Sequence, residues 1–243
     1  MERPRVGIFS LTACAGEQIV ILNCEDELLD LVSAVDIRDF LTATSVNDAE
    51  CDLDVSFVEG TVLNRRDEET VREIRSRSSL LIAVGTCAVW GGVPAMETDV
   101  PREEMIRRVY GDGAGWYDIG LPRKVSDVVN VDGVISGCPI EKEQFLTAVA
   151  DLLNGNLPLL TDTPVCMECK MKENVCLLER GEICCGPLTV GGCSARCPSL
   201  GVACVGCHGP VREANYASQL EMLKEKGFSE AAVIRKLRSF AAV

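Results

Sequence analysis

Cysteines are the residues of this sequence that can carry chemistry, because fourteen of them occur in 243 residues. Nine lie between Cys166 and Cys207, and the other five are dispersed over the preceding part of the chain. A chain of this length does not need disulfides, and thiolates in such numbers usually bind metal. Scattered free thiols are the alternative, but they are common only one or two at a time.

The dense array has the ligand number that two iron–sulfur clusters need. A [4Fe-4S] cluster takes four thiolates, and eight are available here with Cys185 left over. Two four-thiolate zinc sites are the alternative, although gaps of six and seven residues are unusual for zinc ribbons. His208, the only histidine, is predicted to be a bystander. The predicted cluster ligands are Cys166, Cys169, Cys176, Cys184, Cys193, Cys197, Cys204 and Cys207.

The part before the array alternates apolar runs with amphipathic segments, which is typical of βαβ units and a parallel sheet. We therefore expect an α/β fold: a flavodoxin-like doubly wound parallel sheet over 1–160, then a small ferredoxin-like cysteine-rich module with C-terminal helices over 161–243. The predicted strands are 5–12, 35–44, 52–58, 80–85 and 132–136. The predicted helices are 19–32, 68–76, 102–109, 141–154, 213–226 and a last one capped by Ser229.

In such a sheet, ligands bind beyond the carboxyl ends of the strands. Cys14, Cys87 and Cys138 each follow a predicted strand, so we expect them to converge at one end of the sheet. Cys51 precedes its strand and belongs at the opposite end, and Cys24 lies on an apolar stripe of the first predicted helix. We expect both of these to be structural.

Two short motifs predict the local structure around two of the converging cysteines, Cys138 and Cys87. Pro139 follows Cys138 and is suited to the first turn of a helix, whose N-terminus would stabilise an anionic cluster. Cys87 lies in a run of small residues, 85–88, which predicts a turn whose backbone can approach a cluster closely.

Composition restricts the partners and the compartment. A formal charge of −13 would repel a phosphate backbone, which excludes nucleic acid. No apolar window reaches the length of a spanning helix and no signal peptide is evident, so we expect a cytoplasmic protein without membrane contact. The long segment 88–130 carries both tryptophans and is expected to pack against a partner.

Together these motifs resemble the small, electron-transfer subunit of cytoplasmic [NiFe] hydrogenases. The branches that are most similar are the sulfhydrogenase delta subunit and the methyl-viologen-reducing small subunits linked to heterodisulfide reductase. The resemblance covers nearly the full chain. The segments that carry it are 6–14, 57–60, 83–88, 136–139 and 166–207.

The resemblance implies three iron–sulfur clusters, mainly [4Fe-4S]. In this family a CxxC pair after the first strand and two later cysteines hold a proximal cluster beside the nickel–iron site of a large subunit, a role that falls on Cys14, Cys87 and Cys138. Glu17 stands where the second cysteine of the pair is expected. Its carboxylate is predicted to complete the cluster; a [3Fe-4S] cluster, a water or partner ligand, and a Glu17 that only starts the helix are the alternatives. Glu59 is a candidate proton relay or backup ligand.

The implied function is electron relay between a [NiFe] large subunit and a further iron–sulfur or flavin subunit, and no residue of this chain is assigned a catalytic role. One alternative is an adapter in a hydrogenase-like complex whose large partner lacks nickel. A two-zinc binding module is the non-redox alternative. The quinone-site subunit of respiratory NADH dehydrogenase would instead show adjacent cysteines after the first strand and no eight-cysteine tail.

Overall fold

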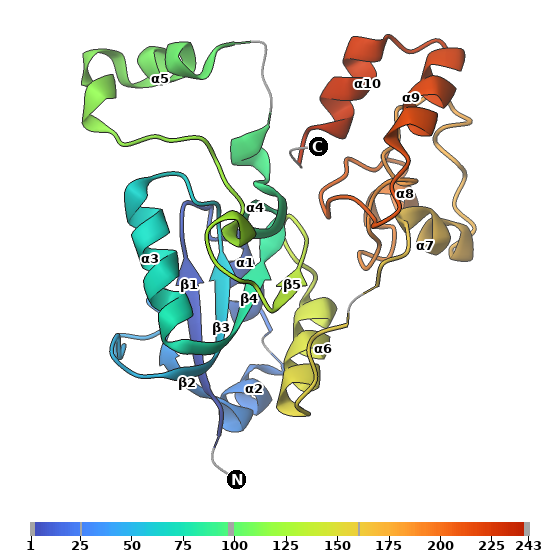
Figure 1. Ribbon diagram of the computed structural model, residues 1–243. Helices are drawn as coiled ribbons and strands as arrows, with labels where there is room; N and C mark the ends of the chain where they lie inside the picture. Colours follow the sequence, from blue (N-terminus) through green and yellow to red (C-terminus); the bar gives the residue numbers. More distant parts are fainter. Residues whose placement is uncertain (1–2, 25, 97–99, 160, 241–243) are drawn as a thin grey trace.

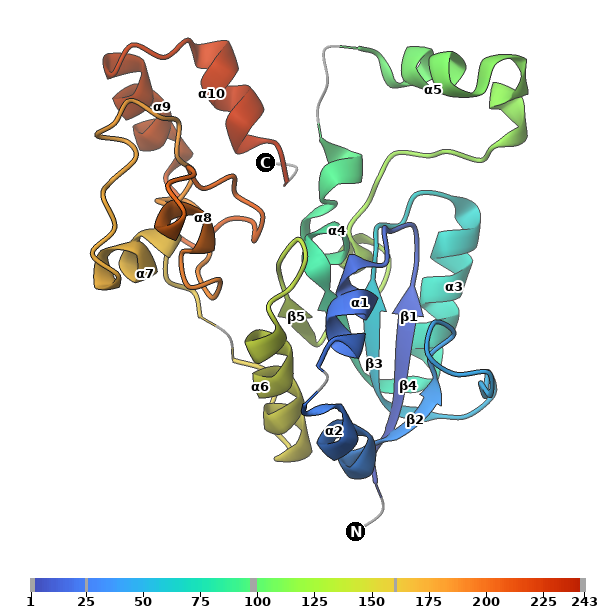
Figure 2. The ribbon, with the colours of Figure 1, turned by 180° about the vertical axis from the view of Figure 1, so that it is seen from behind.

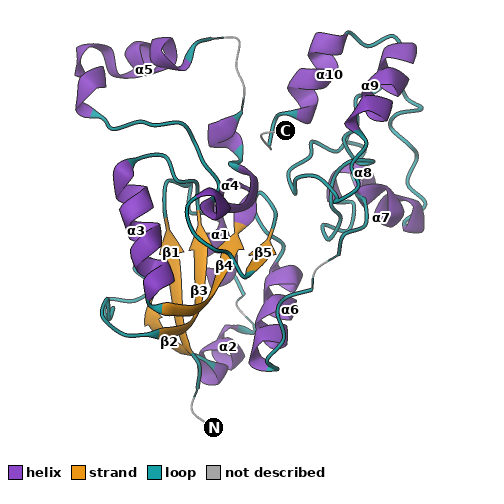
Figure 3. Ribbon diagram, in the orientation of Figure 1, coloured by secondary structure: helices purple, strands orange, loops and turns teal. Residues whose placement is uncertain are grey.

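A computed structural model describes residues 3–24, 26–96, 100–159 and 161–240. Its first part is a five-stranded parallel sheet with strand order β2-β1-β3-β4-β5 (Figure 3). This is the order of flavodoxin-like doubly wound sheets, so the predicted fold class is confirmed. The strands are β1 Arg5–Ser10, β2 Asp36–Asp39, β3 Leu53–Glu59, β4 Ser78–Val84 and β5 Gly133–Ile135.

The central strands are buried on both faces, as expected for a parallel sheet between helices. On β3, Phe57 belongs to one apolar core, where its ring packs edge-on against Phe145 at a centroid distance of 5.4 Å. Its neighbour Val58 belongs to the core on the other face, with Val71. Helices α1 Gly16–Leu22, α2 Leu28–Ala34 and α6 Lys142–Leu153 cover the first face, and α3 Arg65–Ser76 covers the second (Figures 1 and 2).

The single helix predicted over 19–32 is wrong, because the chain forms two short helices there. Helix α1 ends where the backbone N–H of Asn23 bonds back to carbonyls of its last turn. Cys24 is then buried in the sheet core, and its thiol donates to the Val20 carbonyl at 3.5 Å. Cys24 is therefore structural, as predicted, but it lies in the connection between α1 and α2 rather than on a helix.

A projecting arm follows the fourth strand. The short helix α4 Gly85–Trp90 continues through a turn at Val93–Ala95, and the arm then carries α5 Arg102–Tyr110 and the 3₁₀ helix η2 Gly111–Trp116. Figures 1 and 2 show α5 beyond the carboxyl end of the sheet, away from the helices that cover it. The chain returns through η3 Val125–Asp127 to β5.

The described part of the cysteine-rich module, residues 161–240, lies beside the sheet (Figure 1). Its core contains Leu177, Cys184 and Cys185, and the side chain of Ser229 caps the last helix by accepting from Ala232 N at 3.3 Å, as predicted. The predicted boundary at 160 falls on a residue outside the described ranges. The helices of the module are α7 Val165–Met171, α8 Arg196–Ser199, α9 Tyr216–Glu225 and α10 Glu230–Leu237.

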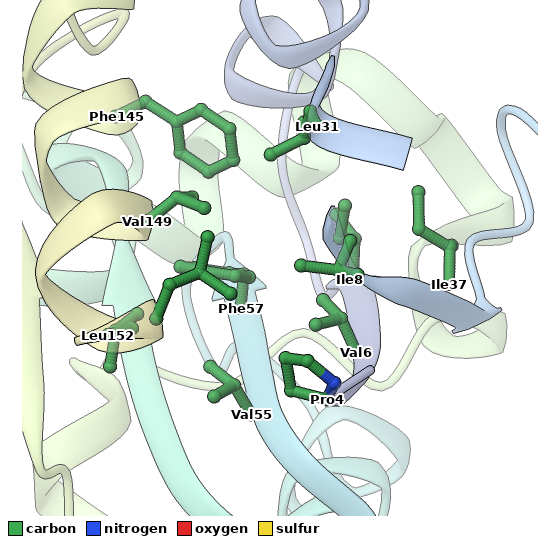
Figure 4. Close-up of a pocket in the computed structure, with 12 residues that line it drawn as sticks. Pro4, Val6, Ile8, Leu31, Ile37, Val55, Phe57, Phe145, Val149 and Leu152 are labelled. Atoms are coloured by element: carbon green, nitrogen blue, oxygen red, sulfur yellow. The ribbon is translucent and has the colours of Figure 1, made fainter. Parts of the chain in front are cut away.

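A small apolar pocket of about 40 Å³ lies between α2, α6 and the sheet (Figure 4). Val6 and Val55 place it toward the amino ends of β1 and β3, which is the end of the sheet opposite the clustered cysteines. Every residue that lines it is apolar, so it is part of the core. Within the described ranges, no helix combines the length and the apolar character of a membrane span.

Candidate metal centres

The three cysteines predicted to converge lie in neighbouring segments at the carboxyl end of the sheet, two of them in loops and Cys87 in the first turn of α4. Cys14 follows β1, Cys87 follows β4 and Cys138 follows β5. The pKa of Cys87 is raised to about 12, first by burial and then by the charges of Cys138 and Glu17. The pKa of Cys138 is raised to about 11 by burial and then by Glu17 and Cys14. The structure thus brings all four predicted proximal residues together, which we call the proximal set.

Glycines leave room beside these side chains. A Cβ on Gly92, which has φ +59°, would lie 2.6 Å from the sulfur of Cys87. A Cβ on Gly16 would lie 3.2 Å from the sulfur of Cys14. At Gly85, which has φ +82°, a Cβ would collide with the carboxyl group of Glu17. Because these positions are glycines, the backbone approaches the proximal set more closely than it could with a larger residue at the same positions.

Two buried carboxyl groups face the same crevice. Glu17 is 4% exposed and Glu59, at the end of β3, is 2% exposed. Burial, and then the adjacent Glu59, raises the pKa of Glu17 to about 8. Neither carboxyl oxygen of Glu59 has a hydrogen-bond partner among the described residues. Buried carboxyl groups without a cation partner are costly in a structural role and typical of functional sites.

The predicted position of Cys138 at a helix N-terminus is wrong. Helix α6 begins at Lys142 with Glu141 as its N-cap, so Pro139 lies outside the helix. Ile140 is buried in the sheet core, and the segment that brings it there separates Cys138 from the helix. Cys138 is held by the loop alone, and its peptide bond to Pro139 is cis. The predicted turn around Cys87 is in fact the first turn of α4.

The eight predicted ligands of the module separate into two sets. Burial, and then the charges of Cys184, Cys169 and Cys176, raises the pKa of Cys166 to about 11. For Cys207 the pKa is raised to about 12 by burial and then by Cys204, Cys193 and Cys197. The first set is Cys166, Cys169, Cys176 and Cys184, and the second set is Cys193, Cys197, Cys204 and Cys207.

The two sets adjoin where Cys204 N donates to the sulfur of Cys184 at 3.4 Å. A Cβ on Gly186 would lie 3.4 Å from the sulfur of Cys166 and 3.5 Å from that of Cys184. Among the residues that the structure describes, no three Cys, His, Asp or Glu side chains form a group that could hold a single metal ion. In a [4Fe-4S] cluster four thiolates hold four irons, so no such single-ion group is required.

Sequence reasoning missed the contacts that join the proximal set to the second set. The hydroxyl of Thr86, next to Cys87, donates to the carbonyl of Cys207. The hydroxyl of Ser136 donates to the next carbonyl, that of His208, at 2.5 Å. Trp90 also packs against Gly209, and its indole fills the space that a Cβ on Gly209 would need. The only signal in the sequence was a hydroxyl residue close to each of two predicted ligands.

The remaining cysteines and the histidine have structural surroundings. Cys185 is buried, and its thiol points to the carbonyl of Lys236 at 3.8 Å, which ties α10 to the module. Cys51 lies before β3, at the opposite end of the sheet as predicted, with its thiol 3.5 Å from the Asp48 carbonyl. His208 is buried with Nδ1 3.0 Å from the Gly191 carbonyl, and burial lowers the pKa of its ring.

Comparison with known sequences gives relatives that match along most of the chain. The chain is 42% identical to the delta subunit of sulfhydrogenase 2 of Pyrococcus furiosus, over 98% of this chain and 99% of that one. It is 33% identical to a vhu F420-non-reducing hydrogenase subunit of Methanocaldococcus jannaschii, over 84% and 81%. It is 24% identical to an iron-sulfur subunit of the F420-non-reducing hydrogenase of Archaeoglobus profundus, over 82% and 79%.

Solved structures share the fold. A chain of an NAD+-reducing [NiFe]-hydrogenase matches 65% of this chain and 96% of its own length with a TM-score of 0.56 and 26% identity. A chain of the actinobacterial-type NiFe-hydrogenase from Ralstonia eutropha matches 98% and 91% with a TM-score of 0.61, at 18% identity.

The family model described as NADH ubiquinone oxidoreductase, 20 Kd subunit, matches residues 14–152. This span begins at Cys14, ends in α6 and contains the whole proximal set. The eight-cysteine module lies beyond it, within the full-length similarity to the sulfhydrogenase subunit. The chain therefore belongs to the NADH ubiquinone oxidoreductase 20 kDa subunit family and, within it, to the small, electron-transfer subunits of [NiFe] hydrogenases.

Proposed function

We propose that this chain holds three iron–sulfur clusters and relays electrons between the H2-activating large subunit of a [NiFe] hydrogenase complex and a further iron–sulfur or flavin subunit, in the cytoplasm. The observation that carries the proposal is the division of the site residues into three adjoining sets. Each set has four members, and two of the sets consist of cysteines alone. Relatives with hydrogenase names along the full chain support the same function.

The residues fit iron–sulfur clusters by their chemistry. Soft thiolates are the usual ligands of such clusters, and glycines lie beside sulfurs of the proximal set and of the first set. Bound clusters supply carriers for one electron at a time. Glu17 would complete the proximal set through a carboxylate oxygen, and we assign to the adjacent Glu59 the role of accepting or passing a proton. All of these thiols must lose their protons when metal binds.

The contacts favour an order in which the proximal set comes first, the second set next and the first set last. Cys138 is among the charges that act on Cys207, whose carbonyl also accepts from Thr86. The first set adjoins the second through Cys184. The first and last sites in this order both reach the surface, because Cys14 of the proximal set and Cys176 of the first set are exposed. We assign the end at Cys14 to the large subunit and the end at Cys176 to the further subunit.

Anaerobic metal analysis of the purified complex tests the proposal. We expect iron and acid-labile sulfide in amounts that three clusters require, with a loss of about one cluster in Cys207→Ala. Cys51→Ala is the matched control, because Cys51 lies at the far end of the sheet, and it should keep the full iron content. Zinc without labile sulfide would instead support the two-zinc module.

A second candidate function, the adapter whose large partner lacks nickel, is favoured by the carboxylate at Glu17. The proximal set is the one that we assign to the large subunit, and a carboxylate in place of a cysteine there agrees with a large subunit that has lost its nickel. The presence of two CxxC nickel motifs in a large subunit encoded nearby, together with nickel in the purified complex, supports hydrogenase activity. Their absence supports the adapter.

A further inference from the structure

Glu168 lies next to the first set in the sequence, but its side chain contacts the loop that carries Cys193 of the second set. It lies on α7 between Cys166 and Cys169. Its carboxylate crosses to the loop that carries Cys193, where Oε1 accepts from Gly192 N at 2.5 Å and Oε2 accepts from Ala195 N at 2.9 Å. Oε2 also lies 3.9 Å from the sulfur of Cys193.

The loop is shaped around this carboxylate. A Cβ on Gly191 would lie 3.0 Å from Oε1 of Glu168, so a larger residue would crowd it. Ser194 and Ala195 adopt φ values of +54° and +48°, in the left-handed region that side chains other than glycine rarely occupy. A conformation of this kind persists when surrounding contacts hold it, and the two hydrogen bonds to Glu168 are such contacts. The N–H groups of Gly192 and Ala195 are thereby directed at Glu168.

No described cation pairs with this carboxylate. Arg196 is the neighbouring cation, but its guanidinium pairs with Glu141 at 2.5 Å. His208 also faces this region, and its buried ring donates to the Gly191 carbonyl. The two backbone N–H groups are therefore the contacts that balance the negative charge of Glu168.

We propose that Glu168 is a positioning residue that lowers the redox potential of the cluster on the second set, by fixing the Cys193 loop and placing a negative charge beside the Cys193 sulfur. The inference rests on the proposed function. A cluster gains negative charge when it takes up an electron, so a nearby carboxylate disfavours the reduced state. The carboxylate also takes the N–H of Gly192 and competes with the Cys193 sulfur for the N–H of Ala195, and hydrogen bonds to cluster sulfurs raise the potential.

Redox titration of the assembled complex, followed by electron paramagnetic resonance, tests the inference. The second-set signal is identified as the one that Cys197→Ala removes. Glu168→Gln keeps the shape of the side chain and removes its charge, so the midpoint should rise. We expect about a tenfold gain in the reduced-to-oxidised ratio at fixed potential, which is about 59 mV for a one-electron couple. Glu168→Asp withdraws the charge by one methylene and should give a smaller rise.

Glu221→Gln is the control, because it makes the same charge change at an exposed position on α9. It should leave the midpoint unchanged. If Glu168→Gln holds both module clusters and keeps the wild-type midpoint, or moves it no further than the control, the role of Glu168 is overturned. If Glu168→Gln does not hold the cluster, Glu168→Asp decides, and an unchanged midpoint there overturns it. Absence of any iron–sulfur signal in wild type would instead refute the proposed function.

Discussion

At the residue level, we expect the chemistry of the proximal set to depend on the carboxylate of Glu17. It is buried beside Cys87 and Cys138, whereas an acid that only begins a helix is usually exposed. Removing it by Glu17→Ala should give a three-iron or solvent-ligated cluster, because the fourth ligand is lost. Glu17→Cys should give an ordinary four-thiolate cluster with a different midpoint. Spectroscopic redox titration of both variants against wild type measures the change.

Glu59→Gln is the control for this prediction, since Glu59 is equally buried in the same crevice. If Glu59 only moves protons, its variant keeps the wild-type cluster type. Indistinguishable proximal signals in the wild type and both Glu17 variants would show that Glu17 is not a ligand. A changed cluster type in Glu59→Gln alone would assign the fourth ligand to Glu59.

Among the elements, the arm that carries α5 and η2 has no buried residue in either helix. Trp116 is 87% exposed, and the neighbouring Leu121 and Val109 are also exposed. Trp90, by contrast, is half-buried and packs against Gly209 of the same chain, and the packing of the segment 88–130 against a partner stays a prediction. Exposed aromatic residues of this kind mark interaction surfaces.

We expect hydrogen exchange in 101–121 to become protected only when the large subunit is bound, because the arm has little cover within its own chain. Helix α3, which is packed on the sheet, is the internal control and should be protected in both states. Trp116→Ala should weaken assembly by about 2 kcal/mol if it is a central contact. Leu41→Ala, at a comparably exposed position, should not. Equal protection of the arm in the isolated chain would contradict the docking role.

In the molecule as a whole, the hydroxyl contacts of Thr86 and Ser136 join the sheet domain to the module. Thr86→Val should destabilise the chain by about 1–3 kcal/mol, because it leaves the Cys207 carbonyl and the N–H of Gly137 without their partner. It should also weaken the magnetic interaction between the proximal and second-set clusters. Thr86→Ser keeps the hydroxyl and is the control. Denaturant unfolding and electron paramagnetic resonance measure the two effects, and a wild-type result in both for Thr86→Val would contradict this contact.

The relay as a whole predicts that two activities can be separated. Cys193→Ala or Cys204→Ala should abolish electron delivery to the further subunit, because each removes a ligand of the second set. Hydrogen–deuterium isotope exchange needs only the nickel site of the large subunit and should persist. Dye reduction through the module and isotope exchange measure the two activities. Equal loss of both in a complex that remains assembled would show that the second set does not serve onward delivery.

The fold class could be predicted because its signals are local. Apolar runs such as the one at Leu80–Val84 and the amphipathic period of α3 follow from backbone geometry over a few residues. Cys14, Cys87 and Cys138 could be placed at one end because every parallel strand ends there. Helix ends and breaks were less predictable: the division at Cys24 depends on how that residue packs into the core.

The residues that we propose as metal ligands, and the end of the sheet where three of them meet, could be read from the sequence because they depend on residue type and strand direction. The separation of the eight module cysteines into two sets became visible only in the folded molecule. The same holds for the contacts of Thr86 with Cys207 and of Ser136 with His208, and for the contact of Glu168 with the Cys193 loop. These are contacts between residues far apart along the chain, and packing of the whole molecule, rather than local spacing, fixes which of them form.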